Sequence, residues 1–588
     1  MEISRYLSRA SVTRRMFLGT AAAGLAGLLV ACGGDDDDEP EATTAPAEET
    51  PAATASGGEA TEAPAEATEA EAEPTEEEAE SGESSGGTFR YGAVEPEDVD
   101  PGITGSPWSL SELFEGLVVI SPEDGTTSPA MAESYEANAD GTVWTYKIRP
   151  DMQWSDGTPL NANDFLYSWR RVMDPATASK YAAIFYPIKN GEAIAAGDMT
   201  PDQLGVAAVD DLTFEVTLEE PMPFFPIISA TWTAYPVPQH VVEEAGNKWL
   251  EPENMVVNGP FIITEWKHDQ LMVFEPNPTY WGDKPHIDRA EYTIYDDWVA
   301  KGLTAYENDE VDHALVPAAE YERALSDPAL SAEMKGFPAS STEMIHFDTR
   351  NAPTDDVRVR QALALGWDRE ALIKQVLKDY YLVAPTILPA DIPGNNPGAA
   401  LEGDIAKAKE LLAEAGFPDG EGWPENFSLV SRTTTPLPII TQYLQQQWKE
   451  NLGIDVQLQP LEPRAYVEWR SARADQLYNA HLGIWGSDFA DPSNWHNQLF
   501  ASNADFYKTH WKNDEYDKLI ADALVETDEE KRLQMYSDAE VILVREAANV
   551  AVYHGQNFYV IKPHVSNVFH LPTAAAGSWL KLIKLSSD

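Results

Sequence analysis

The chain of 588 residues contains one cysteine, Cys32, at the end of an apolar run that spans 16–31. Because there is no second cysteine, the fold uses neither a disulfide bond nor a thiolate metal site. Arg14 and Arg15 precede the apolar run, and a basic start followed by a short apolar stretch is typical of an export signal. The folded part must therefore rely on buried apolar surface and hydrogen bonds.

The four residues 29–32, Leu-Val-Ala-Cys, fit a lipobox, in which small residues let a signal peptidase cut before the cysteine. We expect a signal peptide over 1–31 and a diacylglycerol on Cys32, which would anchor the protein to the outer face of the cytoplasmic membrane, at the cell surface or in the periplasm. A cysteine within a membrane anchor is the alternative, but the apolar run is short for a span. Residues 13–18 also resemble a twin-arginine signal, so export through the Sec or the twin-arginine route stays open.

Residues 33–87 contain 19 Asp or Glu and no Lys, Arg or aromatic residue. Such a segment cannot bury enough apolar surface to fold, and its like charges keep it extended. We expect 32–87 to be a lipidated N-terminus followed by a disordered acidic tether. A plain spacer is favoured over an interaction tail, because a charge run is usually only solvated.

The remaining residues, 88–588, carry 78 acidic and 36 basic side chains. This negative field argues against nucleic acid and acidic lipid as partners, so we expect membrane contact only through the lipid anchor. The charge suits a cationic or zwitterionic ligand, although an ordinary acidic solvated surface explains it equally well. The length allows two or three domains, and no second apolar run is long enough to span a membrane.

Strand and helix patterns alternate along this part of the chain. Apolar and polar residues alternate from 142 to 149, which predicts a half-buried strand. Asn161 precedes a helical periodicity and Asp164 lies in its first turn, which predicts a capped helix. A further helix is predicted to start at Asp404 and to stop at Gly416.

The C-terminal region is expected to contain a helix and two strands. Thr527 and Glu530 have the spacing of a capping box that opens a helix. Residues 550–553 and 558–560 are rich in apolar and β-branched side chains, and we expect them to be paired strands around Gly555.

The sequence contains no recognisable catalytic constellation. Eleven histidines are scattered without a metal-ligand spacing, and a nucleophile elbow, a phosphate loop and a dinucleotide-binding glycine pattern are all missing. Carboxylate pairs are abundant, but they mean little in a chain this acidic. The sequence therefore predicts a protein that binds rather than an enzyme, with no cofactor and no metal.

The chain contains a series of motifs spread over 88–588. They are SPAMAESY (128–135), TVWTYKIR (142–149), WSDGTP (154–159), DFLYSW (164–169), NGPF (258–261), EPNPTYW (275–281), DVRVRQAL (356–363), DRE (368–370) and AKELLAEAGF (408–417). In register over essentially all of 88–588, they resemble the family 5 solute-binding proteins of ABC importers. The segments that resemble the oligopeptide-binding branch are DPATAS (174–179), LGV (204–206) and YPVP (235–238).

The resemblance implies an α/β, two-lobed periplasmic-binding-protein-like (type II) fold with an extra domain in the N-terminal lobe. Three domains would then surround a hinge and a cleft. Their expected bounds are 88–114, 239–340 and 556–588 for domain I, 115–238 for domain II, and 341–555 for domain III. Two or three chain crossings between the lobes make a hinge, so a ligand would be trapped by domain closure.

The motif WGSDFADPSNW, residues 485–495, supplies the main candidate for ligand binding. In peptide-binding relatives the aspartate of this Trp-x-x-Asp motif pairs with the α-ammonium group of the ligand, and the adjacent backbone bonds the peptide as an added strand. A cleft tyrosine of the relatives also has a match here. The candidate ligand-binding residues are therefore Asp488, Trp485, Gly486, Ser487 and Tyr181.

Structural roles compete with these assignments. Asp491 precedes a proline and is expected only to start a turn. Trp485 and Tyr181 could equally be buried structural residues. His481 is expected to be structural rather than a ligand contact, because a lone histidine usually is.

Relatives that hold short peptides present basic side chains to the carboxylate of the ligand. The aligned positions here are Leu377, Leu437 and Leu482. We hypothesise that this cleft does not clamp the carboxylate of a tripeptide-sized ligand. It would hold longer peptides, peptides of variable length or another solute that bears an amine.

The resemblance implies the substrate-binding lipoprotein of an ABC importer, a monomer that captures extracellular oligopeptides and delivers them to a permease and ATPase complex. One alternative is the same scaffold with another solute, such as an oligosaccharide, a metal chelate or haem. A surface receptor or an extracellular hydrolase without a role in import is the other alternative.

Overall fold

The computed structural model describes residues 86–104, 109–122, 125–401, 403–472, 477–504, 506–570 and 578–586. The expected signal peptide, the lipidation site at Cys32 and nearly all of the expected tether lie outside these residues. Within them, every helix is too short or too polar to cross a bilayer.

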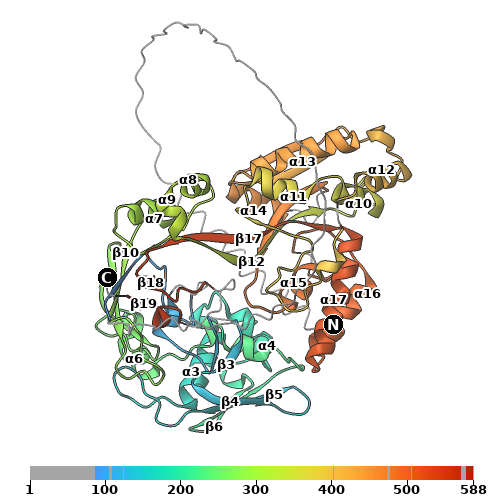
Figure 1. Cartoon of the computed structure of the whole chain (residues 1–588). Helices are drawn as coiled ribbons and strands as arrows, with labels where there is room; N and C mark the ends of the chain where they lie inside the picture. The colour runs from blue at the N-terminus through green and yellow to red at the C-terminus, as the bar shows by residue number, and fades with distance from the viewer. Residues whose placement is uncertain are drawn as a thin grey trace, which may run out of the picture. The chain divides into compact units, whose positions relative to one another are not determined.

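Most strands of the described residues join one mixed sheet of eleven strands (Figure 1). Its order is β15, β14, β16, β12, β17, β11, β1, β10, β9 and β8, with β13 paired to β17. The bounds are β1 Thr88–Ala93, β8 Phe261–Lys267, β9 Leu271–Pro276, β10 Arg289–Ile294, β11 His313–Val316, β12 Met334–Phe347, β13 Leu382–Val383, β14 Ser428–Arg432, β15 Gln457–Leu461, β16 Ala480–Gly486 and β17 Asn549–Ile561.

Two long antiparallel strands, β12 and β17, connect the two halves of this sheet. The C-terminal end of β17 pairs with β11, whereas the C-terminal half of β12 pairs with β16. The register between β12 and β17 shifts between Ala339 and Thr342, where Gly555 lies opposite Ala339. Figure 1 shows the two strands running between the part that carries α7 to α9 and the part that carries α10 to α14. The predicted domain bounds stay a prediction.

The C-terminal strands differ from the expectation, because 550–553 and 558–560 belong to one continuous strand, β17, rather than to two paired strands. Gly555 is not a turn residue. A Cβ atom there would lie 2.1 Å from Oγ of Ser341 and 3.2 Å from Cβ of Ala339, so the glycine permits close approach of β12.

A separate antiparallel sheet contains four strands in the order β4, β5, β7 and β6. Its strands are β4 Ala132–Ala137, β5 Val143–Ile148, β6 Val206–Asp210 and β7 Thr213–Thr217. The strand predicted over 142–149 is thus confirmed as β5, with Trp144, Tyr146 and Ile148 buried. The remaining strands form the two-stranded sheets β2 Val118–Ile120 with β3 Thr127–Pro129 and β18 Val565–Ser566 with β19 Lys584–Leu585.

Capping residues explain where the helices start. Asn161 accepts from the backbone of Asn163, and Asp164 reaches back to the N–H of Asn161, which confirms the capped helix α3. Asp404 caps α12 as predicted. The cap of α17 was assigned wrongly, because Asp528 rather than Thr527 accepts the N–H of Lys531.

The helices of the described residues are mostly short. They are α2 Leu110–Leu113, α3 Ala162–Met173, α4 Gly191–Ala195, α5 Phe225–Ser229, α6 Gln239–Ala245, α7 Trp298–Glu307, α8 Tyr321–Ser326, α9 Pro328–Glu333, α10 Val357–Leu365, α11 Arg369–Ala371, α12 Ile405–Glu414, α13 Leu437–Leu452, α14 Pro463–Ser471, α15 Ser493–Trp495, α16 Asp514–Val525 and α17 Glu529–Glu546.

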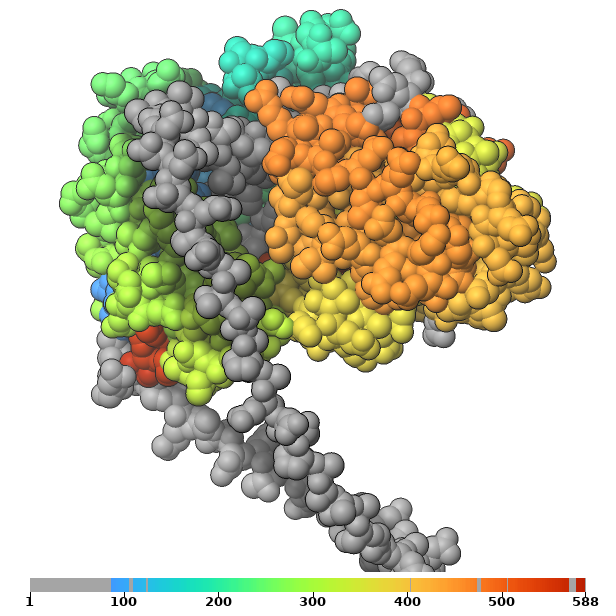
Figure 2. Space-filling model, turned by 90° about the horizontal axis from the view of Figure 1, so that it is seen from above, coloured from blue at the N-terminus to red at the C-terminus, as the bar shows by residue number. Residues whose placement is uncertain are grey.

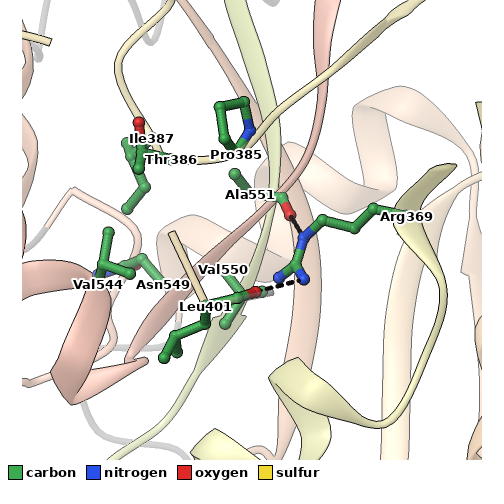
Figure 3. Close-up of a pocket in the computed structure, with 9 residues that line it drawn as sticks. All are labelled: Arg369, Pro385, Thr386, Ile387, Leu401, Val544, Asn549, Val550 and Ala551. Atoms are coloured by element: carbon green, nitrogen blue, oxygen red, sulfur yellow. Dashed lines mark hydrogen bonds between the residues drawn. The ribbon is translucent and has the colours of Figure 1, made fainter. Parts of the chain in front are cut away.

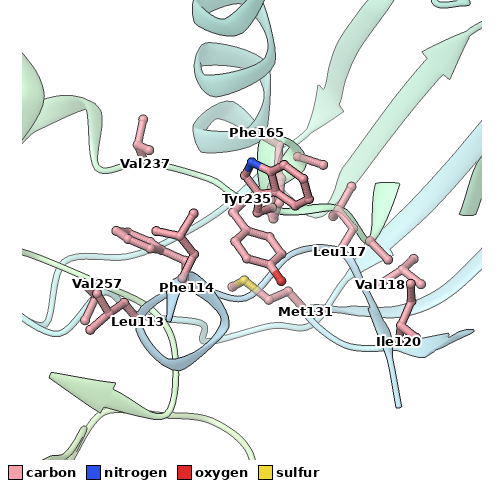
Figure 4. Close-up of a cluster of buried hydrophobic side chains, with 14 of the residues drawn as sticks. Leu113, Phe114, Leu117, Val118, Ile120, Met131, Phe165, Tyr235, Val237 and Val257 are labelled. Carbon is pink, nitrogen blue, oxygen red and sulfur yellow. The ribbon is translucent and has the colours of Figure 1, made fainter. Parts of the chain in front are cut away.

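Separate apolar cores stabilise the parts of the molecule. The largest one joins β1, β8 and β10 of the large sheet to the four-stranded sheet and its helices. In Figure 4, Phe114, Leu117 and Met131 surround the ring of Tyr235 in this core. A second core packs α10, α12 and α13 on β14 and β16, and a third lies between β12, α16 and α17. Figure 2 shows residues of about 400–500 and of about 240–340 on separate areas of the surface.

Candidate functional site

The segment 485–495 lies where β16 ends, beside the long strand β12. Gly486 is opposite Ser341 in the ladder, and the N–H of Ser487 donates to the carbonyl oxygen of Ser340 at 2.7 Å. Asp488 follows as the first residue beyond this contact and is half-buried. Strand β12 therefore fixes the position of the segment that carries the carboxylate of Asp488.

Asn494 holds this segment from the other side. Its Oδ1 accepts from the backbone N–H of Asp488 at 3.0 Å and from Nε1 of Trp485 at 3.3 Å. Its Nδ2 donates to Oε1 of Gln498 at 2.7 Å and reaches Oδ2 of Asp488 at 3.4 Å. One buried amide thus connects the main chain and the side chain of Asp488 to its neighbours.

Trp485 and Ser487 are largely buried. The ring of Trp485 is 1% exposed and packs in the third core against Phe506, so its side chain supports the segment from behind. The hydroxyl oxygen of Ser487 accepts from Nε1 of Trp495 at 2.8 Å. These contacts favour the structural interpretation of the Trp485 side chain.

Asp491 starts a turn, as expected, because its Oδ1 accepts the N–H of Ser493 at 2.9 Å. The structure adds a partner that the sequence did not predict. Nη2 of Arg532, on α17, contacts both carboxylate oxygens of Asp491 at 2.6 and 2.7 Å. Both side chains are buried, so the ion pair is shielded from solvent and fixes the segment against α17.

A contact between aromatic rings links the segment to the four-stranded-sheet part. The ring of Phe489 stacks on Phe224 with 6.2 Å between centroids, and the guanidinium of Arg532 lies 4.8 Å from the centre of the same ring. Phe224 follows β7 in the chain. No motif signalled this contact, because the partners are more than two hundred residues apart.

Tyr181 lies in the four-stranded-sheet part and is half-buried. Its ring packs on Trp232 with 4.8 Å between centroids. Its N–H contacts the hydroxyl of Ser179 at 3.4 Å. This packing fixes the ring and is compatible with either a structural or a ligand-binding role, so the ligand contact stays a prediction.

His481 is a satisfied core residue. Its Nδ1 lies 2.9 Å from the hydroxyl of Tyr466, and its Nε2 lies 3.0 Å from the carbonyl oxygen of Tyr507. Burial lowers the pKa of His481 to about 3, so the imidazole is neutral at physiological pH. The structural interpretation from the sequence is therefore confirmed.

Tyrosine hydroxyls lie beside two carbonyl groups of the β16 backbone. The hydroxyl of Tyr466 lies 2.6 Å from the carbonyl oxygen of Leu482, and Tyr507 donates to that of Ile484 at 2.7 Å. Tyrosine hydroxyls thus lie against both carbonyl groups. Strand β14 pairs with β16 only as far as His481, so the strand end at Gly486 lies beyond that ladder.

The three leucines at the positions where the family resemblance implied basic residues are core residues. Leu377, Leu437 and Leu482 are 7%, 2% and 0% exposed, and all three belong to the second core. Their side chains place no charge near the segment that carries Asp488. The hypothesis of a cleft without a carboxylate clamp at these positions agrees with this burial.

A buried ion pair beside the register shift of β12 was missed by sequence reasoning. Nη2 of Arg432, at the end of β14, contacts Oε1 and Oε2 of Glu343 at 2.8 and 2.6 Å. Burial raises the pKa of the Glu343 carboxyl, although the Arg432 guanidinium opposes the rise. A single charged residue in a strand pattern gives no sign of such a partner.

Three cavities among the described residues are lined by residues other than Asp488. The one in Figure 3 has a volume of about 10 Å³, close to that of one water molecule, and is too small for an oligopeptide. Arg369 lines it and donates from Nη1 to the carbonyl oxygen of Leu401 at 3.0 Å. Burial lowers the pKa of Arg369 to about 10. A larger cavity of about 560 Å³ lies between Glu220 and α16.

The part of the chain that the structure describes holds no group of three or more His, Cys, Asp or Glu side chains arranged to bind a metal ion.

Comparisons with known proteins agree on one family. The model of the bacterial extracellular solute-binding proteins, family 5, matches residues 126–507. A periplasmic oligopeptide-binding protein, OppA, of Salmonella typhimurium is 34% identical over 493 residues, which are 81% of this chain and 88% of that protein. A probable deoxycholate-binding periplasmic protein, YgiS, of Escherichia coli is also 34% identical over 493 residues, with 81% of this chain and 90% of that protein covered.

A solved structure has the same fold. The unliganded open form of the periplasmic murein tripeptide-binding protein MppA superimposes with a TM-score of 0.76 and 29% identity. The superposition covers 85% of this chain and 98% of that one. The two-lobed type II fold expected from the sequence is thereby confirmed.

Proposed function

The chain belongs to the bacterial extracellular solute-binding proteins of family 5, and on that basis we propose that it captures extracellular oligopeptides for an ABC importer. In this proposal Cys32 carries the lipid anchor and the protein works as a monomer, delivering its ligand unaltered to a permease and ATPase complex. The family consists of solute-binding proteins rather than enzymes.

The observation that carries the proposal is the position of Asp488. Its carboxylate is half-buried at the end of β16 and is held beside the strands that connect the two halves of the large sheet. A carboxylate in such a place can pair with the α-ammonium group of a peptide. A hydrogen bond between charged groups contributes about 1.5 to 3 kcal/mol, which fixes the end of the ligand and its register.

Hydrogen bonds to the main chain of the peptide would let the protein accept peptides of different sequence. The family resemblance points to the backbone next to Asp488, so we place the peptide backbone against Gly486 and Ser487, at the end of β16. Main-chain hydrogen bonds ignore side-chain identity, so one cleft can accept many sequences. Since a micromolar complex requires about 8 kcal/mol, cleft burial must contribute beyond the ammonium bond.

Closure of the lobes would trap the ligand. Only β12 and β17 pair across the middle of the described large sheet, and the register of this pair shifts near Ala339 and Gly555. A pair of strands with a local irregularity can absorb a hinge rotation.

The test uses the exported protein purified without denaturation and a mixture of randomised peptides of four to eight residues. Native mass spectrometry should show a bound peptide, and Asp488→Asn should weaken its binding at least about tenfold, because the charge is lost while the shape is kept. Asp522→Asn, an exposed carboxylate on α16 paired with Lys518, serves as the matched control and should leave the affinity unchanged. Unchanged binding by Asp488→Asn would refute the ammonium anchor.

A bile-acid ligand is the second candidate, since one relative is named as a probable deoxycholate-binding protein. Such a ligand carries a carboxylate, which the negative Asp488 would repel. The same mass spectra decide between the two, because a steroid and a peptide mixture differ plainly in mass. A bound steroid that Asp488→Asn binds more tightly would favour the second candidate.

A further inference from the structure

The amide of Asn494 has only one orientation that satisfies its neighbours. The indole N–H of Trp485 and the backbone N–H of Asp488 can only donate, so the amide oxygen must face both of them. The NH₂ group then faces Oε1 of Gln498 and Oδ2 of Asp488. Two donors and two acceptors are all that an amide offers, and all four are used.

Burial makes this arrangement rigid. Asn494 is 0% exposed and Gln498 is 3% exposed, and Trp485, which donates to Asn494, is fixed in the third core. Water therefore does not compete for the hydrogen bonds of Asn494 to Trp485 and Gln498. A change in the orientation of Asn494 would leave a buried N–H without an acceptor, which is costly.

The contact with Asp488 has two parts. The 3.0 Å bond to its N–H fixes the main chain, and the longer 3.4 Å contact to Oδ2 orients the carboxylate. A lysine or arginine in this place would neutralise the carboxylate. A neutral amide orients it without neutralising its charge.

We propose that Asn494 is the positioning residue for the Asp488 carboxylate, which it holds in the orientation that receives the ammonium group of the ligand. The inference rests on the proposed function, in which Asp488 binds a peptide amine. A carboxylate already oriented before the ligand arrives loses less side-chain freedom on binding, so affinity rises.

The test measures the affinity of one bound peptide with a free and with an acetylated N-terminus. Asn494→Ala should weaken the free-amine form about tenfold, the effect of one hydrogen bond to a charged group, and should leave the acetylated form nearly unchanged. In the Asp488→Asn background the same substitution should have no further effect, because the group that it positions is gone.

Asn497→Ala is the matched control. Asn497 is also buried, but its amide contacts the carbonyl oxygen of Ile520 and the hydroxyl of Tyr536. Its removal should lower the melting temperature and leave the ratio of the two affinities unchanged. If Asn494→Ala does not fold, Asn494→Ser, whose hydroxyl can still accept from the segment, replaces it in the same measurement.

Two failures can be told apart. An equal loss for free and acetylated peptides, while Asp488→Asn affects only the free form, would make Asn494 a purely structural residue and overturn this inference alone. If Asp488→Asn changes neither affinity, the ammonium anchor of the proposed function fails, and the inference fails with it.

Discussion

Glu112 is a carboxyl group enclosed by the core of the N-terminal part. It is 0% exposed and accepts a hydrogen bond from the hydroxyl of Ser578, while its Oε1 has no hydrogen-bond partner among the described residues. Burial raises its pKa from 4.5 to about 7, although Ser578 and Lys581 oppose the rise. The environment of a single side chain thus decides its charge at neutral pH.

Glu112 should make stability depend on pH. The pKa of Glu112 is higher in the folded than in the unfolded protein. The stability that protonated Glu112 contributes is therefore fully present below about pH 4.5, and it is lost as the pH rises to about 7. A rise of this size corresponds to about 3 kcal/mol. Glu112→Gln, which resembles the protonated form, should therefore have a larger free energy of unfolding than the wild type at pH 8, and a similar one at pH 4.5.

Urea denaturation from pH 4.5 to 8 checks this expectation. Glu253→Gln, at an exposed position, is the control and should follow the wild-type curve. Parallel curves for Glu112→Gln and the wild type would show that Glu112 does not titrate in this range.

At the scale of the element, β12 and β17 depend on close approach of their backbones. Each strand exceeds twelve residues and pairs with the other along most of its length, while β16 also pairs with the C-terminal half of β12 and β11 with the C-terminal end of β17. The local sequence of β17 suggested two strands because Gly555 interrupts the apolar run. Close packing against Ala339 and Ser341 explains the glycine instead.

Gly555→Ala should disturb the packing of β17 against β12 where Gly555 lies opposite Ala339. The added Cβ would lie 2.1 Å from Oγ of Ser341 and 3.2 Å from Cβ of Ala339, so the Ser341 side chain must change its rotamer and Ala339 must shift, at a cost of about 1 to 3 kcal/mol. Thermal unfolding should show a lower melting temperature than for Gly398→Ala, whose Cβ meets only Oδ1 of Asn396 at 3.3 Å. Equal melting temperatures for the two variants would show that β12 and β17 tolerate the added atom.

At the scale of the whole molecule, the burial of three leucines bears on ligand choice. Leu377, Leu437 and Leu482 come from distant parts of the chain, and all of them fill the second core. The family resemblance implied basic groups of relatives at these positions. In the proposed function, the carboxylate of a peptide therefore finds no charge clamp from these three positions.

Amidation of the ligand C-terminus should have little effect. We expect tripeptides with a free carboxylate and their C-terminally amidated forms to differ in dissociation constant by less than about threefold, because no ion pair from these positions is lost. Isothermal titration calorimetry with matched peptide pairs checks this, and acetylation of the N-terminus serves as the positive control. A tenfold or larger loss on amidation would place a basic clamp elsewhere in the cleft.

Much of the fold followed from local patterns and from the family resemblance. Alternation predicted β5, and Asn161 and Asp404 were correctly assigned as helix caps, because these signals depend on residues a few positions apart. The cap of α17 was placed one residue early, at Thr527 instead of Asp528. Adjacent residues with similar capping ability differ only in backbone geometry, which the sequence does not state.

The candidate site was predictable only in part. The motif around Asp488 pointed to the segment, whereas the roles of Asn494, Arg532 and Phe224 depend on contacts between distant elements. A polar residue near a motif is common, and nothing in its local sequence tells whether it is buried or which group it faces.

The sequence by itself determined the single cysteine, the acidic composition, the alternation of strands and helices and the membership of a family, because each of these is a property of residue order. Only the tertiary structure decided that Trp485 and the three leucines are core residues, that 549–561 is one strand, and that the amide of Asn494 faces Asp488. Burial and hydrogen-bond partners depend on which distant segments pack together, and the folded chain alone brings those segments into contact.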